Sequence, residues 1–406
     1  MRKILLATTA LVGFVAAGAA QAATSPLNVT VGGSTDFVAG AYHESAKAFT
    51  PATDLSGHDF ETIYDLNFGV TGKANNGIEY GGNLSLNNDP DIANGFHGDT
   101  YNVNVNQANI FMSGAFGKVQ LGDSRGATDL AVTAPTVGEG QVEGRYIDFL
   151  DTQEFAKNLV LGVDSTDHST NITYYTPKVG NDMNKVQLGV SYVPNFYNYG
   201  SSVTQVNNSV AAGTGNALSP YKDVVKGAVA YTGTFNPVTL GLSADIITGS
   251  SNTTSLGQAW IVNGPAGKVR DFTAFDVGGK AALDGFTFGA TYTDQGHYDT
   301  VGAQNNEQHQ YAAGLKYEFS KVAVGVSYLG GEGYSDLLVT PAGQSVATTS
   351  SNYSYVHNFN SYGAGGTYSW APGLTTNLDG VLYSQEVDSA KENDGYVLLV
   401  SQKLAF

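Results

Sequence analysis

Carboxylates crowd into one stretch of the sequence, residues 125–169. This stretch holds eight acidic residues against three basic ones, a formal net charge of −5. Fixed carboxylates raise the local concentration of cations, and crowded carboxylate oxygens are the ligands that Ca²⁺ takes. The sequence therefore predicts a segment that attracts cations, and a calcium site at these carboxylates, or at Asp89, Asp91 and Asp99, is a further hypothesis. The charged residues are Asp129, Glu139, Glu143, Asp148, Asp151, Glu154, Asp164 and Asp167, with Arg125, Arg145 and Lys157.

Motifs of enzymes are missing from the rest of the chain. The seven histidines lie mostly in predicted loops and have no partner four residues away, and the absence of cysteine excludes thiol nucleophiles and cysteine-ligated metals. No Gly-x-Ser-x-Gly turn, phosphate loop or dinucleotide fingerprint stands where a strand opens a helix. We expect no enzyme. Two alternatives remain: an outer-membrane barrel enzyme with a Ser/His/acid set near its rim, and a soluble or surface-attached β-protein that binds sugar or a partner.

Composition and charge exclude one further class of protein. Only 14% of the 406 residues are charged, and 19 basic against 36 acidic residues give a net charge of −17. A protein that neutralises phosphates needs a basic face, so nucleic acid is excluded as a partner.

The first 22 residues have the pattern of a secretion signal. Arg2 and Lys3 precede an uncharged run from Ile4 to about Ala17, and the small-x-small triplet 20–22 follows. We predict cleavage after Ala22 and one domain over residues 23–406. No later apolar run reaches the length of about 20 residues that a transmembrane helix requires.

Strict alternation between apolar and small or polar residues recurs along the mature chain, as in Val322-Ala323-Val324-Gly325-Val326. Period two indicates strands with two different faces. We predict about sixteen strands, an even number. Their ranges are 27–42, 60–71, 77–87, 101–114, 117–124, 170–177, 185–194, 223–235, 237–248, 272–283, 285–294, 308–319, 321–329, 357–370, 374–387 and 394–406.

Short turns and long polar loops alternate between these strands. Turns such as 73–77 and 283–285 have a few residues, whereas 43–59 and 195–222 are long. A transmembrane antiparallel β-barrel with two different rims produces this order, because its periplasmic turns are short and its extracellular loops long. Aromatic residues are predicted at both rims, as two belts at the membrane surfaces. They are Phe116, Phe235, Phe286, Phe319, Trp370 and Phe406 at one rim and Tyr42, Tyr192, Tyr292, Tyr328 and Tyr362 at the other.

The chain resembles a general diffusion porin of the Gram-negative outer membrane, of the acidic alphaproteobacterial type. The features that carry the resemblance are the Gly-rich first strand at 29–41, the long third loop at 125–169, and the last strand from Tyr396 to a terminal Phe406. In this family the last strand is the signal that the barrel-assembly machinery reads. The resemblance implies a homotrimer in the outer membrane, in contact with lipid and lipopolysaccharide, whose water-filled pores pass small hydrophilic solutes and ions and are narrowed by an inward-folded third loop.

The resemblance assigns the acidic segment to the pore constriction, which predicts a preference for cations and no cofactor other than the possible calcium. Arginine is scarce, so the basic wall that such porins set opposite the loop is thin here. A sugar- or dipeptide-selective outer-membrane channel is the alternative function. Lumen glycines such as Gly289 and Gly325 are expected to keep the pore clear. The predicted constriction residues are Asp129, Glu139, Glu143, Arg145, Asp148, Asp151 and Glu154, and the predicted wall residues are Glu61, Asp65, Glu79, Lys226, Asp276, Lys280, Lys316 and Glu318.

Overall fold

The structure is a computed structural model, and it describes ten stretches of the chain. These are residues 26–45, 57–88, 103–138, 144–150, 168–195, 221–251, 270–298, 308–334, 355–387 and 393–406. The predicted signal and the loop carboxylates Glu139, Glu143, Asp151 and Glu154 lie outside the described residues.

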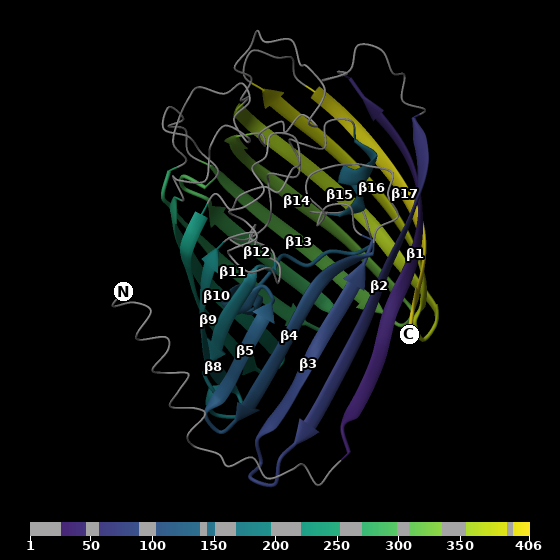
Figure 1. Ribbon diagram of the computed structural model, residues 1–406. Coiled ribbons are helices and arrows are strands. Elements are labelled where there is room, and N and C mark those ends of the chain that lie inside the picture. Colours follow the sequence, from purple (N-terminus) through teal and green to yellow (C-terminus); the bar gives the residue numbers. More distant parts are fainter. Residues whose placement is uncertain are drawn as a thin grey trace.

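The described strands form a single closed antiparallel barrel (Figure 1). Each strand pairs with its neighbours in sequence, and β1 (Asn28–Glu44) pairs with both β2 (His58–Lys73) and β17 (Asn393–Ala405), which closes the wall. The two-residue β7 (Val179–Gly180) continues β6 (Thr170–Tyr175) along β8 (Asn184–Asn195), so the barrel has sixteen strands. The predicted number and fold class are confirmed.

The remaining strands lie close to their predicted ranges. They are β3 (Glu79–Asn87), β4 (Asn104–Gly114), β5 (Gly117–Asp123), β9 (Tyr221–Phe235), β10 (Val238–Ser251), β11 (Phe272–Leu283), β12 (Phe286–Asp294), β13 (His309–Phe319), β14 (Val322–Tyr334), β15 (Tyr355–Ala371) and β16 (Leu374–Val387). No helix in these described stretches is long and apolar enough to cross a membrane.

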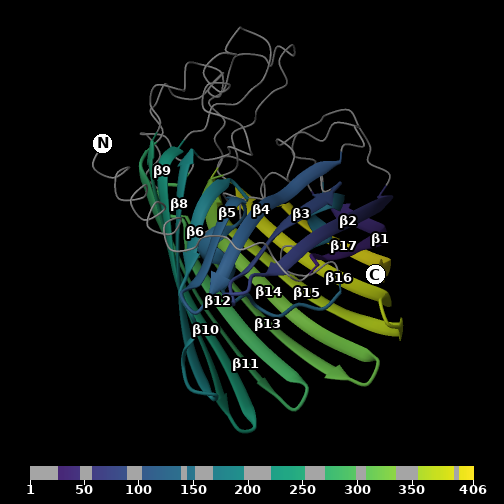
Figure 2. The same cartoon turned by 60° about the horizontal axis from the view of Figure 1, so that its bottom comes forward.

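The two rims of the barrel differ in the length of their connections. Turns of two residues join β11 to β12 and β13 to β14 at one rim (Figure 2), and at the first of them Asp284 and Gly285 both have positive φ, the conformation of a tight hairpin. The other rim carries the long connections. The longest of these follows β5 and contains two short 3-10 helices, η2 (Gly126–Leu130) and η3 (Arg145–Phe149).

The outer face of the wall is apolar, and aromatic rings cover it near both rims. At the short-turn rim Tyr317 lies between Phe286 and Phe319, with ring centroids 4.2 and 5.4 Å apart. At the long-loop rim Tyr328 contacts Tyr362 with centroids 5.0 Å apart. Rings at these heights are the interfacial belts of a membrane barrel. The assignment of Tyr42 to the outer belt is wrong, because its ring packs inside the barrel against Phe149.

An added positive charge is expected to destabilise the barrel when it is placed on the outer face, but not when it is placed on the inner face. Val277 on the outer face of β11 and Asn83 on the inner face of β3 are both exposed. Val277→Arg places a cation against lipid and is expected to lower the free energy of unfolding by about 2–4 kcal/mol. Asn83→Arg places it in water and is expected to change this energy little. Urea titration of the folded variants in lipid vesicles measures both, and equal losses would contradict the assignment of the faces.

Candidate channel lumen

The inner face of the barrel is identified by contacts with the long connection after β5. We call its described residues, 125–138 and 144–150, the inner loop. Its backbone amides at Ala127 and Val132 donate hydrogen bonds of 2.6 and 2.7 Å to the hydroxyls of Ser191 on β8 and Ser243 on β10. Strand register then assigns each remaining wall residue to the inner or the outer face, because direct partners in neighbouring strands share a face.

Glycines on the inner face allow the inner loop to approach the wall closely. A Cβ atom added at Gly278 on β11 would lie 2.3 Å from the carbonyl oxygen of Val132, and one added at Gly314 on β13 would lie 2.0 Å from that of Pro135. Added Cβ atoms at Gly289 and Gly325 would crowd Pro135 and Val137 in the same way. The prediction that Gly289 and Gly325 keep the pore clear is therefore wrong, since they make room for the inner loop.

The second half of the inner loop is held by apolar packing. Tyr146, Ile147, Phe149 and Leu150 are all buried in one cluster with inner-face residues of the wall. Burial of such a side chain contributes about 1.5–3 kcal/mol, so four of them form a substantial attachment. The wall residues of this cluster are Val38, Ile63, Ala312, Leu329, Phe359, Val381, Tyr383, Val397 and Leu399.

The inner loop presents a different surface to the lumen. Asp129, Thr133 and Thr136 are exposed, whereas the alternate residues Val132, Ala134 and Val137 are buried toward the wall. The described part of the loop therefore lies along the wall from β8 to β14 and meets β1 and β17 at η3, with hydroxyl groups facing the open space.

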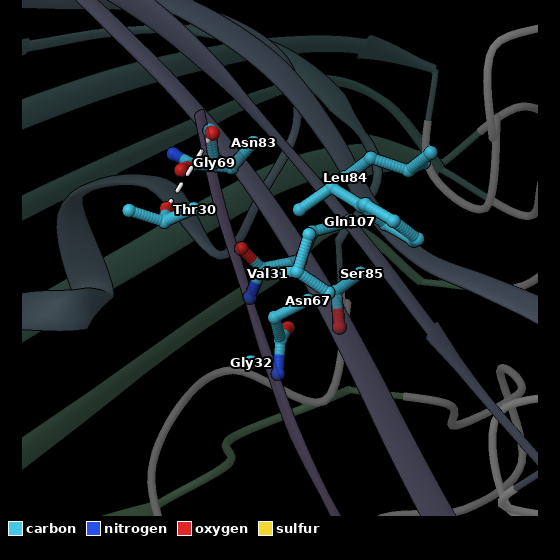
Figure 3. A pocket seen from close by; sticks show the side chains of 10 residues that line it. Thr30, Val31, Gly32, Asn67, Gly69, Asn83, Leu84, Ser85 and Gln107 are labelled. Atoms are coloured by element: carbon cyan, nitrogen blue, oxygen red, sulfur yellow. Dashed lines mark hydrogen bonds between the residues drawn. The ribbon is translucent and has the colours of Figure 1, made fainter. Parts of the chain in front are cut away.

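The wall of β1 to β4 carries uncharged polar groups at inner positions. Figure 3 shows a hollow there, and seven of its ten lining residues are inner-face residues. Asn67 and Asn83 are exposed, and Asn83 donates a hydrogen bond of 3.4 Å to Asn109 on β4. The seven inner-face residues are Thr30, Gly32, Asn67, Gly69, Asn83, Ser85 and Gln107.

Three of the seven predicted constriction residues lie in the part of the chain that the structure describes. Asp129 is exposed on η2, next to the hydroxyl of Tyr175 at 3.4 Å. Arg145 and Asp148 form an ion pair of 3.5 Å on η3, so their charges offset each other. Four other predicted residues, Glu139, Glu143, Asp151 and Glu154, lie outside the described residues.

The predicted wall residues all lie at inner-face positions by register. Lys226 is fully buried, however, and its Nζ donates a hydrogen bond of 2.7 Å to the carbonyl oxygen of Arg125, so it supports the inner loop rather than facing water. Asp276 is also buried and accepts a hydrogen bond of 2.7 Å from Thr293. Glu61, Asp65, Glu79, Lys280, Lys316 and Glu318 are half-buried or exposed.

Lys118 is a further wall residue, which the alternation in the sequence does not identify. It lies on the inner face of β5, with its Nζ 5.1 Å from the ring centre of Phe111 and 5.7 Å from that of Tyr175. Two aromatic faces around an ammonium group stabilise its charge. Lys118 lies next to a turn in a strand of only seven residues, so the alternation of apolar and polar residues is too short to show which face it occupies.

The ends of the last strand lie at the two rims. Tyr396 is exposed on the outer face near His43, with ring centroids 5.8 Å apart. Phe406 exchanges backbone hydrogen bonds of 2.9 and 3.0 Å with Gly33 of β1. The terminal residue thus takes part in closing the barrel.

A closed sixteen-stranded barrel with an apolar outer face, two aromatic belts and a polar lumen defines a channel-forming outer-membrane protein. Comparison with known proteins agrees. The sequence model described as Gram-negative porin matches residues 7–388. The chain belongs to the Gram-negative porin family, whose members are channels of the outer membrane rather than enzymes.

Solved structures match the fold at low sequence identity. The in-vitro folded trimer form of OmpT, an outer membrane protein of Vibrio cholerae, has a TM-score of 0.55 at 10% identity, and the match covers 94% of this chain and 100% of that one. The anion-selective porin from Comamonas acidovorans has a TM-score of 0.52 at 14% identity, with the same coverage of 94% and 100%. No curated protein sequence matches the chain.

A disulfide tests the position of the inner loop, because the native chain has no cysteine. The Cβ of Ala127 lies 3.2 Å from a Cβ added at Gly189 on β8. Disulfides need a Cβ separation of roughly 3.5–4.5 Å, so the double variant Ala127→Cys and Gly189→Cys is expected to oxidise after a small adjustment. Thiol counting and non-reducing gels measure this. In the control pair, Ala127→Cys with Asn83→Cys on β3, both thiols stay free. Oxidation of the control pair alone would contradict the position of the loop.

Proposed function

We propose that the protein forms a water-filled pore for passive diffusion of small hydrophilic solutes and ions, narrowed by residues 125–169 and preferring cations. One observation carries the proposal. The inner loop packs on the wall from β8 to β14 and leaves open a hollow on β1 to β4 whose inner-face lining consists of glycines and uncharged amides and hydroxyls. Such a wall exchanges hydrogen bonds with water and neutral solutes without holding them by charge.

Cation preference is attributed to the carboxylates of the long connection. The described inner loop is formally neutral, because Arg125 and Arg145 offset Asp129 and Asp148. The excess of negative charge in residues 125–169 therefore comes from the other acids, chiefly Glu139, Glu143, Asp151 and Glu154. The anion-selective porin from Comamonas acidovorans has a similar fold, so the fold alone does not set the sign of selectivity.

A sugar- or dipeptide-selective channel is the second candidate, and the amide-lined hollow of β1 to β4 favours it. Amide and hydroxyl groups match the hydrogen-bonding groups of sugars and peptides. A block of the ion current that saturates with the concentration of added maltose or a dipeptide would support this function. An ion current that shows no saturable block at any concentration of the solute would support general diffusion.

Assembly and processing follow the family resemblance. We propose a homotrimer in contact with lipid and lipopolysaccharide, inserted by the barrel-assembly machinery through the strand that ends at Phe406, and a mature chain that begins at Ala23. Calcium at the loop carboxylates stays a prediction. The described residues contain no group of three or more metal-ligating side chains.

Neutralising two loop acids is expected to weaken the cation preference. The variant Glu139→Gln with Glu143→Gln removes two negative charges from the proposed constriction, and the ratio of cation to anion permeability should fall by about 2-fold or more. The reversal potential across a salt gradient in a planar bilayer measures this ratio. A matched control, Asp182→Asn with Asp284→Asn, removes the same charge from exposed turns. Equal effects of the two variants would contradict the assignment of selectivity to the loop.

A further inference from the structure

Charged side chains on the inner face are segregated along the axis of the barrel. Six of its seven described inner-face lysines lie within four residues of a strand end at the short-turn rim. We call these six the basic rim. They are Lys73, Lys118, Lys185, Lys280, Lys316 and Lys403.

Carboxylates offset only part of the basic rim. Glu79 lies 3.1 Å from Lys73, Glu318 lies 3.0 Å from Lys316, and Asp36 lies 4.0 Å from Lys403. Six lysines and three carboxylates leave a formal charge of +3. Lys185 and Lys280 are exposed and have no ion-pair partner among the described residues.

The deeper wall has the opposite sign. Apart from Asp36, seven inner-face carboxylates lie five or more residues from a strand end at the short-turn rim, against one lysine, Lys226, which leaves a formal charge of −6. The described inner loop adds no net charge. These carboxylates are Glu44, Asp59, Glu61, Asp65, Asp245, Asp276 and Asp379.

We propose that this axial arrangement makes the pore rectify, with the basic rim as the element that fixes the direction. The proposal rests on the pore function above. Fixed charge fills each zone of a narrow passage with the opposite mobile ion, so cations fill the deep zone and anions fill the basic rim.

The direction of rectification follows from these two zones. When the long-loop side is positive, cations enter through the acidic zone and anions enter through the basic rim, so both accumulate where the zones meet and the conductance rises. When the polarity is reversed, each ion must enter through the zone that repels it, and the junction is depleted. The pore therefore passes more current when the long-loop side is positive.

Salt concentration gives the expected size of the effect. In 0.1 M salt the Debye length is about 10 Å and wall charges act across the lumen, so we expect a current ratio of about 1.5 or more between equal and opposite voltages. In 1 M salt, where the Debye length is about 3 Å, the ratio should approach 1.

Single-channel current–voltage curves of the full-length folded protein test the proposal. The variant Lys185→Glu with Lys280→Glu reverses two unpaired charges, lowers the rim to a formal −1, and is expected to abolish the rectification. The control Lys321→Glu reverses one charge in the exposed turn between β13 and β14, and should keep the rectification. Orientation in the bilayer is read from a Lys280→Cys variant, which a polymer maleimide too large to cross the pore blocks only from the short-turn side.

The outcomes separate the two proposals. Steps of conductance that rectify in the stated direction, lose the asymmetry in the double variant and retain it in Lys321→Glu support the basic rim. Steps with a linear or oppositely directed curve, or a double variant that rectifies like the native protein, overturn it and leave the pore standing. Absence of steps from protein whose gel migration is heat-modifiable overturns the pore and the rectification together.

Discussion

The packing of the inner loop on the barrel wall is the interaction on which the lumen depends. A sixteen-stranded barrel is too wide for its own side chains to fill, so an attached segment must set its free cross-section. Here, glycines such as Gly314 bring loop backbone onto strand backbone, and Tyr146 and Phe149 anchor the far end by burial. Loss of either attachment is expected to move the loop while the hydrogen bonds between strands stay in place.

One wall therefore meets two different requirements. The outer face must be apolar at nearly every position because it contacts lipid, whereas the inner face contacts the loop in one region and water in another. Under the loop the inner face carries glycines, apolar side chains and polar groups that hold the loop, as at Gly278, Leu399 and Ser243, and on β2 to β4 it carries amides such as Asn67 and Asn83. The surface that faces the open lumen is this second region, together with the exposed side chains of the loop and the charged side chains of the inner face.

The strands were predictable because lipid imposes a strict alternation, and the predicted ranges of β11 and β16 match the structure. Alternation also gives the face of a residue, but not what covers it. Lys226 and Lys280 occupy equivalent inner positions in the pattern, yet the loop buries one and leaves the other in water. Tyr42 lies on the inner face by its register with the buried Val397, and the weak alternation of the Gly-rich first strand does not show this in the sequence. Contacts between a loop and a wall leave no periodic signal.

Accessibility of single cysteines tests this division of the inner wall most directly, because the native chain has none. We expect a small charged thiol reagent to modify Asn83→Cys and lower the conductance, while Ser243→Cys under the loop and Leu84→Cys against lipid stay unmodified. Modification of Ser243→Cys at the rate of Asn83→Cys, with an equal loss of conductance, would show that the loop does not cover the wall of β10 and would contradict the account.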